Sequence, residues 1–188
     1  MNLVMRLRFL SSHEYKIIEV RAILEALGIE VVPVSLQIDE IQTDDLDALV
    51  RDKCIKAYRQ IGRPLFVEHT GLKIDALNGF PGGLTRIFWE SLKADRFAEL
   101  FGNGPMTGVT AHTQIGYCDG CKVHHFPGEL KGTIPPTPRG SRDFQWDCVF
   151  VPEGYEETLA EMGTERKNLI SMRRRALDKF GQYLKGRS

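Results

Sequence analysis

The sequence predicts an α/β fold, a long twisted mixed sheet with helices packed at both ends and a cleft between two lobes. The chain opens as strand, turn, helix and strand, an order that is typical of α/β proteins. A long β-hairpin follows in the second half, so strands and helices do not simply alternate and the sheet is expected to be mixed. The 188 residues, 42% of them hydrophobic, can form a substantial core, and we predict a single domain over residues 1–188.

The first half of the chain alternates apolar runs with amphipathic segments. The predicted strands cover residues 3–10, 29–36 and 64–74, and the predicted helices cover 14–27 and 46–61. Apolar residues at helical spacing support the first helix, and Gly28 ends it. Residues 37–47 are polar and acidic and are predicted to form a loop.

The second half begins with a glycine-rich loop at residues 78–83, followed by a predicted helix over 84–101. Residues 106–134 are predicted to form a hairpin that turns at Asp119-Gly120, a dipeptide typical of two-residue turns. The loop over 135–147 is irregular. The chain ends in one strongly basic predicted helix over 164–184.

Charge and hydropathy exclude several classes of partner. Lys plus Arg and Asp plus Glu each total 25, so the chain has no overall basic character and we predict no nucleic-acid partner. The apolar segment Met1–Leu10 contains Arg6 and Arg8 and is too short to span a membrane. It also lacks the pattern of a signal peptide. We therefore expect a cytoplasmic protein with no membrane contact.

The four cysteines are expected to be free thiols in that compartment. Cys118 and Cys121 have CxxC spacing, and His124 and His125 follow, so a zinc site is one interpretation. A closed zinc site needs four ligands, and no second CxxC is present. The spacing is also explained if the two cysteines simply flank the hairpin turn, which is the interpretation that we favour.

Two segments have the chemistry of a phosphate and metal site. Ser11-Ser12-His13-Glu14-Tyr15-Lys16 joins a strand to a helix, whose first N–H groups and dipole attract anions. Two hydroxyls and Lys16 would complete the site, although an ordinary helix cap with a solvated lysine has the same sequence. Glu40 offers oxygen to a hard cation, and Lys53 could reach phosphate. Solvated charges are the alternative for both.

The predicted strand over 64–74 carries Glu68, His69 and Thr70 next to one another near its end. Such a cluster of functional groups at the end of a strand is typical of an active site at the edge of a sheet. A neutral histidine can act as a general base near pH 7. Imidazole is a poor ligand for Mg²⁺ but an acceptable one for Mn²⁺ or Zn²⁺. Glu68 should face the opposite side of the strand from His69.

The C-terminal third offers groups that could bind a base. Phe144, Trp146 and Asp147 lie in the irregular loop, where aromatics can stack and a carboxylate can accept hydrogen bonds. Both aromatics could instead fill the core. On the basic helix, Lys167 and Ser171 are four apart and should share a face. Met172 and Arg173 follow them.

Taken together, these segments resemble the inosine triphosphate pyrophosphatase family. The matching stretches are Ser11–Lys16, Val67–Gly83, Pro138–Asp147 and Thr158–Leu177. Phe144, Trp146 and Tyr155 resemble the eukaryotic branch. The resemblance implies a homodimer with a nucleotide-binding cleft and a Mg²⁺-dependent hydrolase. Its substrates would be deaminated or modified purine nucleoside triphosphates such as ITP, dITP or XTP, cleaved to monophosphate and pyrophosphate.

The resemblance also implies roles for individual residues. Phosphate-binding positions correspond to Ser11, Ser12, His13, Lys16 and Lys53. Glu40 corresponds to a metal ligand, and Thr70 to a nucleotide contact. Base-side positions correspond to Phe144, Trp146, Asp147, Lys167, Met172 and Arg173. His69 takes the catalytic position, with Lys16 and Lys53 as cationic clamps on the phosphates.

Five positions depart from the pattern of that family. His13 replaces an asparagine, and His69 replaces the aspartate that binds metal and activates water. Met172 replaces a histidine, Gln145 a glycine, and Cys148 commonly a proline. Three interpretations follow for His69: a working base, a shift of metal preference towards Mn²⁺, or an impaired site. The last would make the chain a nucleotide-binding or sensor protein on the same fold.

Overall fold

A computed structural model describes residues 5–186. Within this range one seven-stranded sheet has the order β2-β1-β3-β5-β6-β7, and β4 pairs with β3 off this path. The strands are β1 (Met5–Leu10), β2 (Ile29–Val34), β3 (Leu65–Ile74), β4 (Pro81–Gly82), β5 (Gly108–Cys118), β6 (Val123–Thr133) and β7 (Val151–Pro152). The helices are α1 (Glu14–Glu25), α2 (Leu46–Ile61), α3 (Thr85–Phe101), α4 (Leu159–Ile170) and α5 (Met172–Lys185).

The predicted mixed α/β sheet is confirmed. β1 is parallel to both β2 and β3, whereas β3, β5, β6 and β7 pair antiparallel in sequence. β1 meets β3 only at Arg8↔Leu65 and Phe9↔Phe66. β3 then continues beyond β1, and β4 joins it at Leu72 and Lys73. The intervening stretch of β3, which contains Glu68, His69 and Thr70, therefore lies at an open edge of the sheet.

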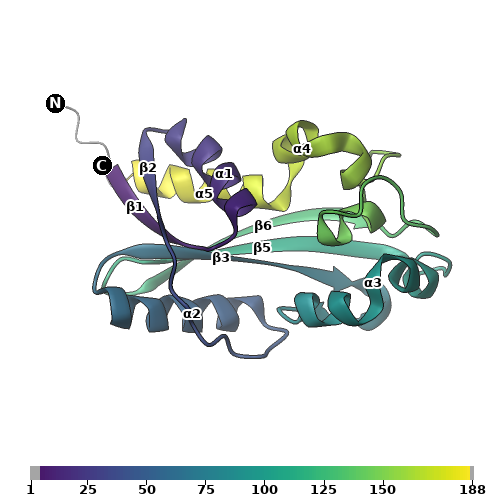
Figure 1. The fold of residues 1–188 in the computed structure, drawn as a ribbon, viewed down its shortest axis with the longest axis horizontal. Helices are drawn as coiled ribbons and strands as arrows, with labels where there is room; N and C mark the ends of the chain where they lie inside the picture. The colour runs from purple at the N-terminus through teal and green to yellow at the C-terminus, as the bar shows by residue number, and fades with distance from the viewer. Residues whose placement is uncertain (1–4, 187–188) are drawn as a thin grey trace.

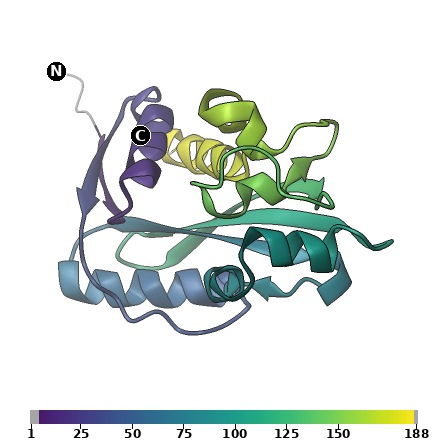
Figure 2. The ribbon, with the colours of Figure 1, turned by 45° about the vertical axis from the view of Figure 1, so that its right-hand side comes forward.

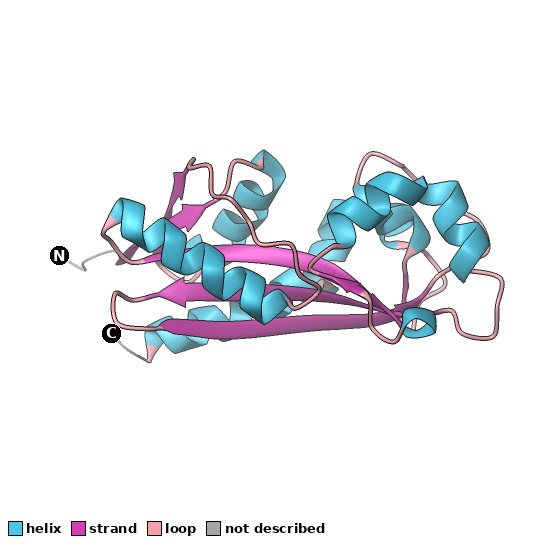
Figure 3. Ribbon diagram, turned by 90° about the horizontal axis from the view of Figure 1, so that it is seen from below, coloured by secondary structure: helices cyan, strands magenta, loops and turns pink. Residues whose placement is uncertain are grey.

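Helices cover both faces of this sheet. Figure 1 shows α1, α4 and α5 on one face and α2 with α3 on the other, and Figure 2 shows the same two layers after rotation. Seen from below, the helices gather towards the two ends of the long central strands (Figure 3). The core forms three clusters, centred on Phe97 and Phe150, on Phe66 and Phe180, and on Val50 and Leu65.

The last predicted helix is in fact two helices, so that prediction is wrong. α4 begins earlier, where Thr158 and Glu161 form a capping box, and α5 begins after Ser171. Ser171 is extended, with φ −61° and ψ 153°. Its side chain accepts a hydrogen bond from the N–H of Arg174, at 3.1 Å. Ser171 therefore caps α5, and it does not share a continuous helical face with Lys167.

The hairpin of β5 and β6 is confirmed, but its turn is longer than predicted. Cys118 pairs with Val123, so Cys121 lies inside the turn. The Oδ1 atom of Asp119 accepts hydrogen bonds from the N–H groups of Cys121 and Lys122 at 2.9 and 3.0 Å. This Asx turn supports a four-residue loop where Asp-Gly alone predicts two residues.

The structure provides no support for the zinc alternative. Cys118 is buried, Cys121 is exposed, and Asp119 accepts a hydrogen bond from His124 at 2.7 Å. Across residues 5–186, no group of three or more His, Cys, Asp or Glu side chains is placed to hold a metal. In the same range no helix is long and apolar enough to cross a membrane. Residues 3 and 4 of the first predicted strand lie outside the described part.

Candidate active site at the open edge of β3

The loop after β1 presents the start of α1 to the open edge of β3. His13 takes an extended conformation at the N-cap of α1 and makes no side-chain cap hydrogen bond. Its N–H donates to Ser11 Oγ at 3.2 Å, and the Ser11 N–H donates to Val34 O at 3.2 Å. The first N–H groups of α1 therefore have no side-chain cap and can receive an anion.

Lys16 of α1 reaches the buried Glu68, with 2.8 Å between Nζ and Oε2. Burial alone would raise the pKa of Glu68, but the charges of Arg173 and Lys16 dominate and hold the pKa well below its usual range. Thr70 also donates to Glu68 and lies 2.7 Å from the hydroxyl of Thr113. Glu68 is thus an ionised carboxylate held between two cations and a hydroxyl.

A second buried carboxylate, Glu19 of α1, completes this network. The Arg173 guanidinium donates to Glu19 and lies 3.4 Å from Glu68, and all three side chains are less than 9% exposed. Sequence reasoning found Arg173 but missed Glu19. A signal was available, because Glu19 is three residues after Lys16 and therefore shares its helical face. Arg173 thereby joins α5 to α1 and β3.

His69 lies on the other face of β3 from Glu68, as strand alternation predicts. Its electrostatic neighbours include Lys16, Lys53 and Glu40. Burial lowers the pKa of His69, and the charge of Lys16 lowers it further, to about 4. The imidazole is therefore neutral at pH 7 and can accept a proton.

Glu40 and Lys53 form an ion pair beside His69. Burial would raise the pKa of Glu40, but the hydrogen bond and charge of Lys53 outweigh it and lower the pKa. Mg²⁺ is commonly held by one or two carboxylates together with substrate phosphates. One ionised carboxylate next to a lysine fits a metal that a phosphate-bearing ligand itself helps to hold.

Arg86, in the first turn of α3, is a cation that sequence reasoning missed. Burial lowers the pKa of His13, as do the charges of Lys16, Lys53 and, most weakly, Arg86. The Arg86 side chain is exposed, and its Nε donates to Glu90 at 3.0 Å. The glycine-rich turn before α3 positions Arg86: a Cβ on Gly82 would lie 2.0 Å from the carbonyl oxygen of Asp44. Arg86 could have been predicted from the sequence, because a cation at a helix start directly after a glycine-rich turn is placed to bind an anion.

Phe144 lies at the other end of the site, 36% exposed. Lys167 Nζ is 4.2 Å from the centroid of its ring and 2.5 Å from Asp147 Oδ2. Burial raises the pKa of Asp147 despite the charge of Lys167. Tyr15 of α1 contacts the same ring edge-on, with centroids 5.4 Å apart. An exposed aromatic ring beside a buried donor is suited to bind a planar heterocycle.

Trp146 and Met172, two of the predicted base-side residues, are buried. Their side chains are 4% and 2% exposed and belong to the core cluster around Phe97 and Phe150. The Trp146 ring lies 5.7 Å from that of Phe150. This burial fits the alternative in which Trp146 fills the core, and contact of these two side chains with substrate stays a prediction. Of the two aromatics in the loop, Phe144 is 36% exposed and Trp146 is buried in the core. The left-handed backbone of Gln145, with φ 41°, lies between them.

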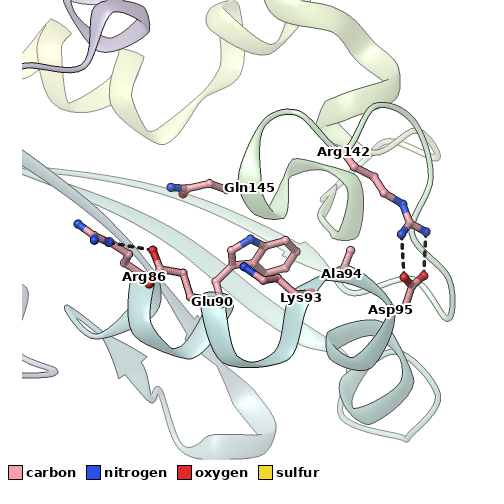
Figure 4. Close-up of a pocket in the computed structure, with 8 residues that line it drawn as sticks. Arg86, Glu90, Lys93, Ala94, Asp95, Arg142 and Gln145 are labelled. Atoms are coloured by element: carbon pink, nitrogen blue, oxygen red, sulfur yellow. Dashed lines mark hydrogen bonds and ion pairs between the residues drawn. The ribbon is translucent and has the colours of Figure 1, made fainter.

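A cavity of about 430 Å³ opens between α3 and the loop that carries Phe144 (Figure 4). Its lining residues are Arg86, Trp89, Glu90, Lys93, Ala94, Asp95, Arg142 and Gln145. Arg142 donates two hydrogen bonds to Asp95, at 2.7 and 2.8 Å. Arg86 of α3 and Gln145, the neighbour of Phe144, both line this cavity.

Comparison with known proteins gives one consistent family. The Ham1 family profile matches residues 7–183. A dITP/XTP pyrophosphatase of Thermococcus kodakarensis is 36% identical over 181 residues, covering 96% of this chain and 98% of that protein. An inosine triphosphate pyrophosphatase of Yarrowia lipolytica is 35% identical over 178 residues, covering 94% of each chain.

Solved structures show the same fold. The Ham1 protein of Staphylococcus aureus superposes with a TM-score of 0.83 at 22% identity, covering 97% of this chain and all of that one. A Ham1 protein from Coxiella burnetii gives a TM-score of 0.80 at 24% identity, covering 97% of this chain and 99% of the other. At such identities the likeness concerns the fold alone.

Proposed function

This chain belongs to the Ham1 family, and on that premise we propose that it is a nucleoside triphosphate pyrophosphatase. The substrates would be deaminated purine nucleoside triphosphates such as ITP, dITP and XTP, cleaved to the monophosphate and pyrophosphate. The relatives named dITP/XTP or inosine triphosphate pyrophosphatase support this reaction.

The observation that carries the proposal is the division of the site into a cationic end and an aromatic end. Lys16, Lys53 and Arg86 come from three different helices. Lys16 and Lys53 act electrostatically on both His69 and His13, and Arg86 acts on His13. Tyr15, the neighbour of Lys16, contacts Phe144, which also lies against Lys167. A ligand with several negative charges at one end and a planar ring at the other matches this division.

At the cationic end, the three cations and the N-terminus of α1 would bind the phosphates and neutralise the charge that develops in the transition state. The neutral imidazole of His69 would accept a proton from the attacking water. As the new phosphorus–oxygen bond forms, the anhydride bond breaks and pyrophosphate leaves with the bonding electron pair.

The metal would be Mg²⁺, held by Glu40 together with phosphate oxygens, and it would offset negative charge on the phosphates. Lys53 keeps Glu40 ionised and close to His69. Mn²⁺ is the alternative ion, because it accepts an imidazole ligand more readily than Mg²⁺ does.

At the aromatic end, Phe144 would stack on the base while Lys167 and Arg173 offer hydrogen-bond donors only. Deaminated purines carry a carbonyl oxygen where adenine carries an amino group. Donor groups therefore favour the deaminated base, because an amino group would leave them unpaired. Asp147 and Glu19 each hold one of these cations in place.

We further propose that the chain is a single domain that acts as a homodimer in the cytoplasm. Light scattering coupled to gel filtration tests the dimer. A mass near twice 21.3 kDa is expected, and a mass near 21.3 kDa would contradict it.

A pyrophosphate-release assay tests the reaction. ITP, dITP, XTP, ATP and GTP would each be supplied with Mg²⁺ or Mn²⁺. We expect pyrophosphate from the deaminated purines at a kcat/KM well above that for ATP and GTP. Equal rates on all five would contradict the base preference, and orthophosphate as the first product would contradict the reaction.

One observation favours a second function, a nucleotide-binding or sensor protein. A histidine with a pKa of about 4 is a weak base and offers Mg²⁺ no oxygen. The two functions differ in outcome, because a sensor binds ITP tightly and releases no pyrophosphate with either metal.

A further inference from the structure

Tyr15 connects the two ends of the candidate site. It lies in the first turn of α1, directly before Lys16, and its side chain leaves α1 towards the loop of Phe144. The two rings are 5.4 Å apart with planes inclined at 77°, an edge-to-face contact. Tyr15 is nevertheless 69% exposed, so most of its ring is free to be covered by a ligand.

Phe144 depends on such contacts for its orientation. It precedes Gln145, whose φ is 41°, and lies in the irregular part of the 135–147 segment. Within the described residues, the contacts recorded for its ring are those with Tyr15 and Lys167. Tyr15 supports the edge of the ring, and Lys167 lies over its face. Removing Tyr15 therefore removes the edge-to-face contact with this ring.

We propose that Tyr15 is a positioning residue for the nucleotide, a role that rests on the proposed function. In any nucleotide the sugar lies between the base and the phosphates. A side chain that starts beside the phosphate-binding Lys16 and ends against Phe144 spans the same interval. The exposed Tyr15 ring would pack against the C–H groups of the sugar and hold Phe144 ready to stack. Because the contact is apolar, ribose and deoxyribose would be bound alike.

The test compares Tyr15→Ala, Tyr15→Phe and the control Ile18→Ala. Ile18 lies on the same helix and is 57% exposed, but it takes no part in the proposed site. We expect Tyr15→Ala to raise KM for ITP and dITP by about three- to tenfold, the range of one aromatic contact. The kcat should stay within about twofold, because the phosphate end is intact. Tyr15→Phe keeps the ring and should behave like the parent, as should Ile18→Ala.

Inorganic tripolyphosphate separates positioning from phosphate binding, because it has neither sugar nor base. Its dissociation constant, measured by calorimetry, should not change in Tyr15→Ala, while that of ITP rises. The role of Tyr15 is overturned if Tyr15→Ala leaves the affinity for ITP unchanged or weakens the binding of ITP and tripolyphosphate equally. It is also overturned if Tyr15→Phe is as impaired as Tyr15→Ala. Calorimetry needs no turnover. A parent protein that binds ITP without releasing pyrophosphate would contradict the hydrolase and leave Tyr15 testable.

Discussion

The environment of His69 determines the pH range in which its imidazole should titrate. A pKa of about 4 means that the imidazole is already neutral across the physiological range. The sequence alone predicted a base that titrates near pH 7, and burial together with the charge of Lys16 moves that titration into the acidic range. In the complex, the triphosphate places negative charge beside the ring and should raise the pKa again.

We therefore expect kcat/KM, which reports the free enzyme, to be level from pH 6 to 8 and to fall as pH drops through about 4. The kcat/KM falls towards low pH because the protonated ring cannot accept a proton from water. The profile of kcat should fall at a higher pH than that of kcat/KM. Steady-state kinetics over pH 3.5–8.5, within the range where the fold persists, measures both.

Two variants accompany this profile. If His69 is a working base, His69→Ala should nearly abolish turnover while sparing ITP binding. If the site is impaired instead, His69→Asp should restore turnover with Mg²⁺. If both variants match the parent in rate and metal preference, His69 is not catalytic.

Gln145 occupies a backbone position that favours glycine. Its φ of 41° is in the left-handed region, which is costly for a residue with a Cβ. We expect Gln145→Gly to raise the free energy of unfolding by about 0.5–1 kcal/mol in urea. Gln182→Gly, the same exchange on α5, should lower it by about 1 kcal/mol. Equal effects at both positions would show that Gln145 is not strained.

At the level of elements, local signals predicted most boundaries well. α2 begins and ends as predicted because Asp45 accepts two N–H hydrogen bonds and Gly62 adopts the left-handed conformation. The break at Ser171 was missed because the basic, amphipathic pattern continues through it. The extended backbone of Ser171 separates α4 from α5. Tertiary ion pairs hold Lys167 to Asp147 before the break and Arg173 to Glu19 and Glu68 after it.

Ser171 should therefore contribute more to stability than an ordinary helical serine. Ser171→Ala removes the acceptor for the Arg174 N–H, and we expect a loss of about 1 kcal/mol in the free energy of unfolding. Ser91→Ala is the control, because the exposed Ser91 only donates to the carbonyl of Ile87 within α3 and should change stability little. A Ser171→Ala variant as stable as Ser91→Ala would rule out the cap.

On the scale of the molecule, the sequence predicted the class of sheet but not its strand order or the convergence of its charges. Glu19, Glu68 and Arg173 lie on three elements, and their separations along the chain, |i−j| of 105 for Glu68 and 154 for Glu19 from Arg173, give no local pattern. The segment proposed to bind phosphate was predictable, because a turn between a strand and a helix fixes the positions of its own neighbouring residues. The base end needed the packing of α1, α5 and the 135–147 loop.

The fold leaves β6 as a long edge strand, because β7 pairs with it only at Gly132 and Thr133. The cations of α5 cover this edge. Arg175 donates to the carbonyl of Glu129 and Lys179 to that of Pro127, each at 2.7 Å. Free strand edges promote association, and cations or proline at the edge oppose it. We infer that α5 closes the β6 edge and that a homodimer would use another surface.

Replacing both cations should expose the carbonyl row of β6. We expect Arg175→Ala/Lys179→Ala to form species larger than the parent, growing with concentration, because the freed carbonyls can pair with another chain. Arg96→Ala/Arg166→Ala is a control matched in charge, since both arginines are exposed and pair with Glu99 and Glu157 away from this edge. Light scattering over a dilution series would show the difference. If the two double variants stay the same size at every concentration, the α5 cations do not protect β6, and the assignment of this edge as closed is wrong.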